Sequence, residues 1–351
     1  MKEVVGGPPP SQGFRDFAHA VKEAIDRELP RWLAPHVAKA KELGGTAFAV
    51  ADAIRTFTTR GGKRIRPVLM AAACEAYGGP RAFDILPALL SVELLQGYLL
   101  IHDDWMDEDE VRRGGPTVHV ALRAQFGSAR AGEIGAVLAG DLAMGYSLTA
   151  LLETRTTPDR LAEATRQLAR MQVEVVAGQV LDVYHDGNVE TVHDLKTTSY
   201  TVRGPLLLGA SLAGASASQK AELEAFAQPL GLAFQLRDDL LGTFGDPQKT
   251  GKSAAGDLQQ GKRTALVHEL LAADRTGEDR ALVERVLGVK DAPAADVARA
   301  LERLATARPR VEARLSALLD ESHAHLGRMD LRAEARNILA GAISALGERE
   351  R

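Results

Sequence analysis

Two pairs of adjacent aspartates, Asp103-Asp104 and Asp238-Asp239, stand far apart in the chain, each in an apolar, helix-like stretch. Asp107 follows Asp103 by four positions, so on a helix both carboxylates project from one face. Acidic runs usually mark a solvated helix end. The turns before Asp103 are apolar on all sides, however, so this carboxylate lies where a buried helix emerges and needs a cation or strong donors. Such carboxylates suit Mg²⁺, which shares its shell with water and substrate phosphates. The pattern predicts a split clamp that binds a diphosphate through magnesium.

Basic residues supply the complementary charge. Residues 61–67 read Gly-Gly-Lys-Arg-Ile-Arg-Pro, which places three cations in a turn directly before a helix N-terminus, where N–H groups and the helix dipole favour an anion. Alone, this motif indicates a solvated basic turn equally well. Arg112-Arg113 follow the first acidic cluster directly, in what must be a flexible loop, so opposite charges stand ready to hold metal and phosphate together.

Further cations follow along the chain. Lys252 and Lys262 come after the second aspartate pair and are expected on a mobile loop that folds over bound phosphate. Lys196-Thr197 offers a cation and a hydroxyl, although from spacing alone an ordinary exposed helix position is the better interpretation. Residues 251–253 read Gly-Lys-Ser, but the spacing to the upstream glycine is one residue too long for a nucleotide-binding P-loop, and the preceding element is a helix.

Composition excludes several other classes of protein. The 43 basic and 47 acidic side chains give a net charge of −4, which argues against general nucleic-acid binding. Cys74 is the only cysteine, so we expect no intrachain disulfide or thiolate metal cluster, and a cytoplasmic location. The first residues lack the apolar core of a signal peptide, and the longest uncharged apolar stretch, 204–218, is too short to span a bilayer, so we expect a soluble protein. The nine histidines show no zinc-ligand spacing, and no nucleophile elbow is present.

The elements that position these residues are predicted to be helices almost throughout. Apolar residues recur with a helical period, alternating strand patterns are scarce, and no βαβ alternation is visible, so we expect an all-α protein. We predict one helical domain over residues 14–351 after a loose arm at 1–13. Expected helices run from 67 toward 77, and over 87–110, 132–153, 158–184, 192–214 with breaks, and 219–244, with four or five more after 261.

Taken together, these motifs resemble the trans-isoprenyl diphosphate synthases, the family of farnesyl and geranylgeranyl diphosphate synthases. Residues 61–67 look like its first basic motif, residues 103–107 like its first aspartate-rich motif, and Arg112-Arg113 like its arginine pair. Lys196-Thr197, Gln235 with Asp238-Asp239, and then Lys252 and Lys262 follow in the family's order. An ordered set of motifs is far more specific than any one of them.

The resemblance implies a single large antiparallel bundle around a deep central cavity, with the two aspartate clusters facing each other across its mouth. It implies Mg²⁺, three ions with the substrate diphosphate, on Asp103, Asp107 and Asp238, supported by Asp104 and Asp239. It implies an allylic diphosphate held by Arg112, Lys196, Thr197, Gln235, Lys252 and Lys262. Isopentenyl diphosphate would bind Lys63, Arg66, Gln96 and Arg113. It also implies a homodimer that condenses these substrates head-to-tail.

Two positions depart from the family's pattern. The second aspartate motif usually has a third aspartate where this chain has Gly242, so that carboxylate's role must pass to water or be dispensable. Gln96 stands where many relatives have histidine, and an amide can still donate to phosphate.

Tyr98 lies deeper than Asp103 on the same predicted helix, where a growing prenyl tail could run. A ring there should stop elongation early, which predicts geranylgeranyl diphosphate first and farnesyl diphosphate second; ordinary packing is an equal alternative. Two other functions stay open. Terpene cyclases also carry an aspartate-rich helix, but their usual second metal motif is not recognisable here. A regulatory subunit would be expected to have lost ligands that this chain retains.

Overall fold

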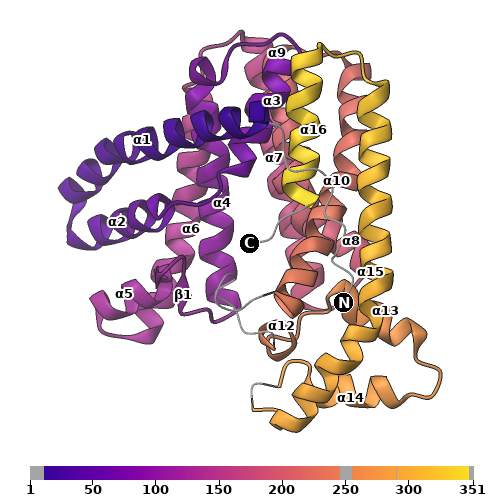
Figure 1. Ribbon diagram of the computed structural model, residues 1–351. Helices are drawn as coiled ribbons and strands as arrows, with labels where there is room; N and C mark the ends of the chain where they lie inside the picture. Colours follow the sequence, from indigo (N-terminus) through magenta and orange to yellow (C-terminus); the bar gives the residue numbers. More distant parts are fainter. Residues whose placement is uncertain (1–11, 246–254, 290, 348–351) are drawn as a thin grey trace. The chain divides into compact units, whose positions relative to one another are not determined.

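Helices account for nearly all the regular structure in the computed structural model, which describes residues 12–245, 255–289 and 291–347 (Figure 1). The elements are α1 Gln12–Leu43, α2 Gly45–Thr59, α3 Ile65–Ala76, η1 Ala82–Ile85, α4 Leu86–Met106, β1 Val111–Arg112, β2 Gly115–Pro116, α5 Val118–Phe126, α6 Ala129–Leu152, α7 Pro158–Val183, α8 Val189–His193, η2 Asp194–Arg203, α9 Gly204–Ala213, α10 Ala217–Phe244, α12 Gly256–Gln259, α13 Ala265–Ala273, α14 Glu278–Val286, α15 Ala294–Arg328 and α16 Ala333–Gly347. The prediction of an all-α protein is confirmed.

The chain forms two compact units that exchange segments. One comprises 15–169 and 205–215 and is called the first unit below. The other comprises 1–14, 170–204 and 216–351 and is called the second unit. The single domain over 14–351 stays a prediction, and the predicted arm at 1–13 lies almost wholly outside the described residues.

The first unit is built around α4 and α6, which lie side by side (Figure 1). Small residues on α6 allow this close approach: a Cβ added to Gly140 would lie 2.1 Å from the His102 ring on α4. In the same way, a Cβ added to Gly132 would lie 2.5 Å from the carbonyl oxygen of His119 on α5. The α4–α6 pair therefore fixes the end of α4 where Asp103 stands.

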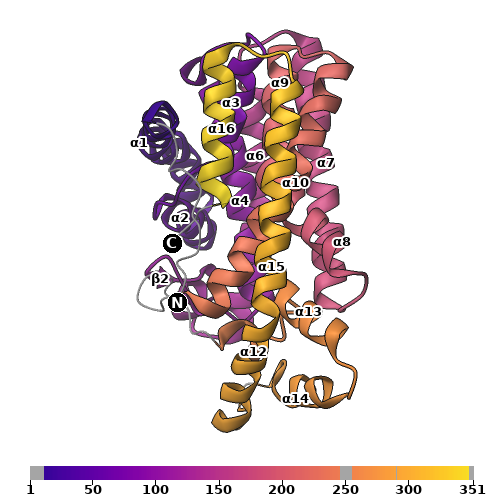
Figure 2. The ribbon, with the colours of Figure 1, turned by 45° about the vertical axis from the view of Figure 1, so that its right-hand side comes forward.

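The second unit packs α10 against α15 and η2, with α16 beside α10 and α15 (Figure 2). In α15 the buried residues Ala300, Leu304, Ala307, Val311, Leu315 and Leu318 recur at intervals of three and four, as an amphipathic helix requires. Ser216 begins α10 with a capping box closed by Gln219, close to the predicted start. These contacts hold the face of α10 that carries the second aspartate pair.

Two described segments, Ala82–Met106 and Ala129–Leu152, are long and apolar enough to cross a membrane by length and composition alone. Packed core helices meet the same criterion, and both segments contribute to the core of the first unit. They are therefore weak evidence for a membrane span.

Candidate active site

The first acidic cluster stands at the C-terminal end of α4. Helix α4 ends at Met106, earlier than predicted, but the N–H of Asp107 still donates to the carbonyl of Asp103, at 2.8 Å. Because Asp107 keeps a helical conformation, its carboxylate and that of Asp103 share one face. Asp104 is fully buried and accepts a hydrogen bond from Nε of Arg112. Burial raises the pKa of Asp104 to about 7, although the charge of Arg112 lowers it. Asp104 thus holds Arg112 in place beside the partly buried carboxylates of Asp103 and Asp109.

The segment predicted as a flexible loop is a short β-hairpin, so that prediction was wrong. Strand β1 pairs with β2, and the two turn residues Arg113 and Gly114 have φ of 50° and 72°. Positive φ at both positions is the type I′ turn that matches the twist of a two-residue hairpin. Arg60 fixes the hairpin by donating from Nη1 to the carbonyl of Pro116, at 2.6 Å. Arg112 is therefore presented to the acidic cluster by defined backbone.

The basic turn at 61–67 is held from within by one buried arginine. Arg64 adopts a left-handed conformation, with φ of 51°, before α3 begins. Its guanidinium pairs with Glu93 at 2.6 Å and with Asp26 at 2.9 Å, and it donates to the carbonyl of Thr58. Lys63 is exposed and Arg66 is buried. The cations predicted to bind phosphate therefore stand on a turn anchored by Arg64.

Positive charges from the hairpin and from the basic turn at 61–67 converge in the first unit. Nη1 of Arg113 donates to the carbonyl of Gly61, at 2.5 Å, which joins the hairpin turn to the basic turn. Burial lowers the pKa of Arg113, and nearby guanidinium groups lower it further against the opposing charge of Glu93. Those groups belong to Arg64, Arg66 and Arg112. An excess of cations at one place favours a polyanion such as a diphosphate.

Tyr98 and Gln96 lie deeper on α4. The Tyr98 ring packs edge-on against His102, with centroids 5.0 Å apart, and His102 Nε2 lies 3.0 Å from the carbonyl of Val137 on α6. His102 is therefore a packed residue. Gln96 is partly buried, and its role stays a prediction.

In the second unit, Lys196 and Thr197 lie on η2, a π-helix rather than an α-helix. Short π-helical segments often occur at functional sites. Nζ of Lys196 lies 2.5 Å from Asp182 Oδ2, and a Cβ on Gly178 would lie 2.3 Å from the Lys196 backbone nitrogen. The close approach of α7 to η2 thus fixes the lysine backbone.

A chain of hydrogen bonds links η2 to the second aspartate pair. Thr197 donates to Gln235 Oε1 at 2.7 Å, and Gln235 donates from Nε2 to Asp239 Oδ1 at 2.7 Å. Asp239 Oδ2 accepts from the N–H of Ala265 at 2.8 Å and lies 3.6 Å from His193 Nε2. Burial raises the pKa of Asp239, although these partners oppose it. Asp239 therefore links Gln235 on α10 to the start of α13 through its hydrogen bonds. Asp238 beside it is less buried.

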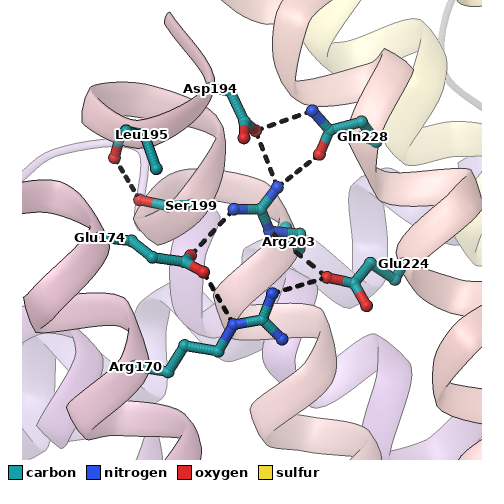
Figure 3. A network of polar contacts seen from close by, with 8 residues as sticks. All are labelled: Arg170, Glu174, Asp194, Leu195, Ser199, Arg203, Glu224 and Gln228. Carbon is teal, nitrogen blue, oxygen red and sulfur yellow. Dashed lines mark hydrogen bonds and ion pairs between the residues drawn. The ribbon is translucent and has the colours of Figure 1, made fainter. Parts of the chain in front are cut away.

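Figure 3 shows a polar network, missed by the sequence analysis, that anchors η2. Arg203 at the end of η2 lies 2.9 Å from Glu174 on α7 and 2.8 Å from Asp194, and it also contacts Gln228 on α10. The partners are 9 to 29 residues from Arg203 in sequence. No local sequence spacing relates these residues. The one available sign of the network in the sequence was an arginine inside an apolar stretch, and the sequence analysis did not use it.

The structure thus assembles the predicted residues in two groups. The first unit brings together Asp103, Asp104, Asp107, Arg112 and Arg113 with the basic turn, and the second joins Lys196, Thr197, Gln235 and Asp239. Lys262 lies after α12 in the second unit, and Lys252 lies outside the described residues. Because the clusters belong to different units, their facing arrangement stays a prediction.

The donor set fits Mg²⁺. Among the described residues, no three His, Cys, Asp or Glu side chains are arranged to hold a metal ion by themselves. Mg²⁺ typically uses one or two carboxylates, with water and substrate phosphates completing its shell. Asp103 and Asp107 together, or Asp238, could provide these carboxylates. The metal-binding roles of all five aspartates stay predictions.

Comparisons with known proteins agree with this chemistry. A family model described as polyprenyl synthetase matches residues 49–304. The short chain isoprenyl diphosphate synthase of Methanocaldococcus jannaschii is 34% identical over 250 residues, covering 70% of this chain and 72% of the relative. The farnesyl diphosphate synthase of Geobacillus stearothermophilus is 34% identical over 260 residues, covering 71% and 82%. The crystal structure of geranylgeranyl pyrophosphate synthase from Corynebacterium glutamicum, complexed with isoprenyl diphosphate and magnesium, has a TM-score of 0.86 at 32% identity and covers 96% of this chain and 99% of that one.

Proposed function

Because the chain belongs to the polyprenyl synthetase family and is a prenyltransferase, we propose that it condenses isopentenyl diphosphate head-to-tail with an allylic diphosphate in an Mg²⁺-dependent reaction. It has that family's all-α isoprenoid synthase fold. Geranylgeranyl diphosphate is the favoured product and farnesyl diphosphate the second.

The observation that carries this proposal is the intermixed charge in the first unit. Nη2 of Arg112 lies 4.0 Å from Asp103 and 3.5 Å from Asp109, while Arg113 reaches the basic turn. Carboxylates alone would repel a diphosphate. Guanidinium groups alone could bind a diphosphate directly, without any need for carboxylates beside them. Side by side, they suit a diphosphate that arrives with divalent metal.

The described residues then divide the chemistry between them. Bound Mg²⁺ would neutralise charge on the departing diphosphate. Arg112 and Lys196 add positive charge there, which favours ionisation of the allylic C–O bond. Thr197 and Gln235 orient that group through their shared hydrogen bond, and Lys63, Arg66 and Arg113 hold isopentenyl diphosphate. Its alkene attacks the allylic carbon, and the proton lost afterwards passes to the departing diphosphate. No side-chain nucleophile is needed.

A homodimer is part of the proposal, and α6 offers a face for it. Ile134, Leu138, Leu148 and Leu152 are 46%, 55%, 37% and 52% exposed and, with Gly145, repeat at intervals of three, four or seven along one side of the helix. Exposed Asp141 lies on the same side, so the stripe is apolar toward both ends and carries one acidic residue near its centre. Exposed apolar patches of this kind often mark a protein–protein interface. Two copies of the stripe can pair antiparallel, because its large residues lie toward both ends.

Product analysis tests the function. Purified protein is incubated with isopentenyl diphosphate and, in turn, dimethylallyl, geranyl or farnesyl diphosphate, with Mg²⁺ or with EDTA. We expect a C20 prenyl diphosphate with Mg²⁺ and none with EDTA. Conversion of an allylic diphosphate without isopentenyl diphosphate would instead favour a terpene cyclase. An inactive homomer that binds both diphosphates would favour a regulatory subunit.

A further inference from the structure

Gly242 departs from the family's second aspartate motif, and the structure places another carboxylate against it. Gly242 follows Asp238 by four residues in α10, so the two share one face of the helix. A Cβ added to Gly242 would lie 2.2 Å from Oδ2 of Asp257. Real Cβ atoms do not approach an oxygen so closely, so a side chain at 242 would displace the Asp257 carboxylate from its present position.

Asp257 is held there by its own short helix. It lies in α12, and its carbonyl accepts from the N–H of Lys262, at 2.9 Å. The neighbouring Leu258 is buried, and its carbonyl accepts from the N–H of Gly288, at 2.8 Å. The side chain of Asp257 is only 15% exposed. Its position against α10 is therefore set by packing and backbone hydrogen bonds.

The charges around Asp257 are those of the proposed diphosphate site. Oδ1 of Asp257 lies 3.8 Å from Nζ of Lys262, one of the cations assigned to the allylic diphosphate. Burial raises the pKa of Asp239, and the negative charge of Asp257 adds to that effect. Asp257 is therefore close both to the aspartate pair and to a phosphate-binding lysine.

We propose that Asp257 supplies the carboxylate that the second motif lacks at Gly242, and acts with Asp238 on the Mg²⁺ that accompanies the diphosphate. This inference rests on the proposed function. Mg²⁺ needs only one or two carboxylates when phosphate and water complete its shell. The motif keeps its charge because glycine at 242 leaves room for an aspartate from elsewhere in the chain.

Binding of inorganic pyrophosphate by isothermal titration calorimetry, with and without Mg²⁺, tests this independently of turnover. In the wild-type protein Mg²⁺ should strengthen pyrophosphate binding. In Asp257→Asn that gain should fall about tenfold, while binding without Mg²⁺ should be unchanged or tighter because one repelling charge is gone. Asp320→Asn, an exposed acid on α15 of the same unit, should behave as the wild type.

Two further variants guard against simple loss of folding. Gly242→Ala keeps the Asp257 carboxylate but displaces it, so it too should reduce the Mg²⁺-dependent gain. The double variant Gly242→Asp with Asp257→Gly should recover most of the gain, because the carboxylate returns from α10. A full gain in Asp257→Asn would overturn the inference. Absence of any gain in the wild type would instead count against the proposed function itself.

Discussion

Arg112 donates from Nε to the fully buried carboxylate of Asp104, while Nη2 of the same guanidinium lies 3.5 Å from Asp109. The arginine comes from the β-hairpin and the aspartate from α4. The pair therefore ties the hairpin to the helix and balances a buried negative charge that would otherwise be costly.

Measured above the Asp104 pKa of about 7, replacing Arg112 with glutamine should lower the free energy of unfolding by about 3 kcal/mol, because it leaves the ionised Asp104 without its partner. Adding Asp104→Asn should restore part of this loss. Urea unfolding of the single and double variants measures the coupling. Arg123→Gln, which removes an exposed pair with Glu110 at 3.0 Å, should cost less than about 1 kcal/mol. Equal losses for the two arginines would contradict a buried pair.

Acidification should weaken the anchor of η2 through Glu174. Burial raises the pKa of Glu174, but hydrogen bonds and charge from Arg170 and Arg203 outweigh it and hold that pKa below 4.5. The stabilisation is therefore present above pH 4.5 and is lost as pH falls through the lower, folded-state pKa. Thermal unfolding of the wild type should lose stability over that window, and Glu174→Gln should lose less.

Glu163→Gln is the matched control on the same helix, because its pair with Arg166 at 3.3 Å is exposed. It should follow the wild-type pH profile. Parallel profiles for Glu174→Gln and the wild type would show that the Arg203 network does not carry the acid sensitivity.

Helices and caps that depend on residues close together in the sequence were predicted. Features that depend on contacts between residues far apart in the sequence were not. The period of apolar residues located α7 and α10 almost to their ends, and Ser216 with Gln219 forms a cap that is visible as a spacing of three. The hairpin was missed because each strand has only two residues, too few for an alternating pattern. Its turn, Arg113-Gly114, was nevertheless legible as a two-residue turn ending in glycine.

The candidate site shows the same division. Motif spacing found the aspartates and cations, since their roles follow from residue type and order. It did not find Asp257, because only the fold brings α12 against Gly242. Nor did it find Arg203, whose partner Glu174 is 29 residues away. The π-helical form of η2 is likewise set by packing against α7 and α10.

A methyl group at Gly178 should disturb the site from a distance. It would lie 2.3 Å from the backbone nitrogen of Lys196, and backbone cannot move aside cheaply. Gly178→Ala should therefore lower the free energy of unfolding by roughly 1–3 kcal/mol and reduce prenyl transfer by displacing Lys196. Gly327→Ala, a helical glycine with open space around it, should be neutral or slightly stabilising. Wild-type stability and activity in Gly178→Ala would contradict the close packing of α7 and η2.

The apolar stripe of α6 predicts a sharp effect on assembly. Leu138→Glu replaces the most exposed large residue of the proposed dimer face with a charge, so sedimentation should detect monomer at concentrations where the wild type is dimeric. Leu43→Glu alters a leucine that is 77% exposed on α1, away from the stripe, and should leave the dimer intact. A dimer that survives Leu138→Glu unchanged would place the interface elsewhere.

Tyr98 links the packing of α4 to product length. The Tyr98 ring is 8% exposed and packs on His102, the residue that directly precedes Asp103. The ring therefore occupies volume below the proposed diphosphate site. Tyr98→Ala should open that space and shift the products from C20 toward longer prenyl diphosphates, as resolved by reversed-phase chromatography after phosphatase treatment. Tyr146→Ala truncates another buried tyrosine of the first unit, which packs on His36, and should leave the product distribution unchanged. Because both truncations cost packing energy, a change of length confined to Tyr98→Ala identifies a steric stop, whereas unchanged lengths would show that Tyr98 serves only to pack α4 against α6.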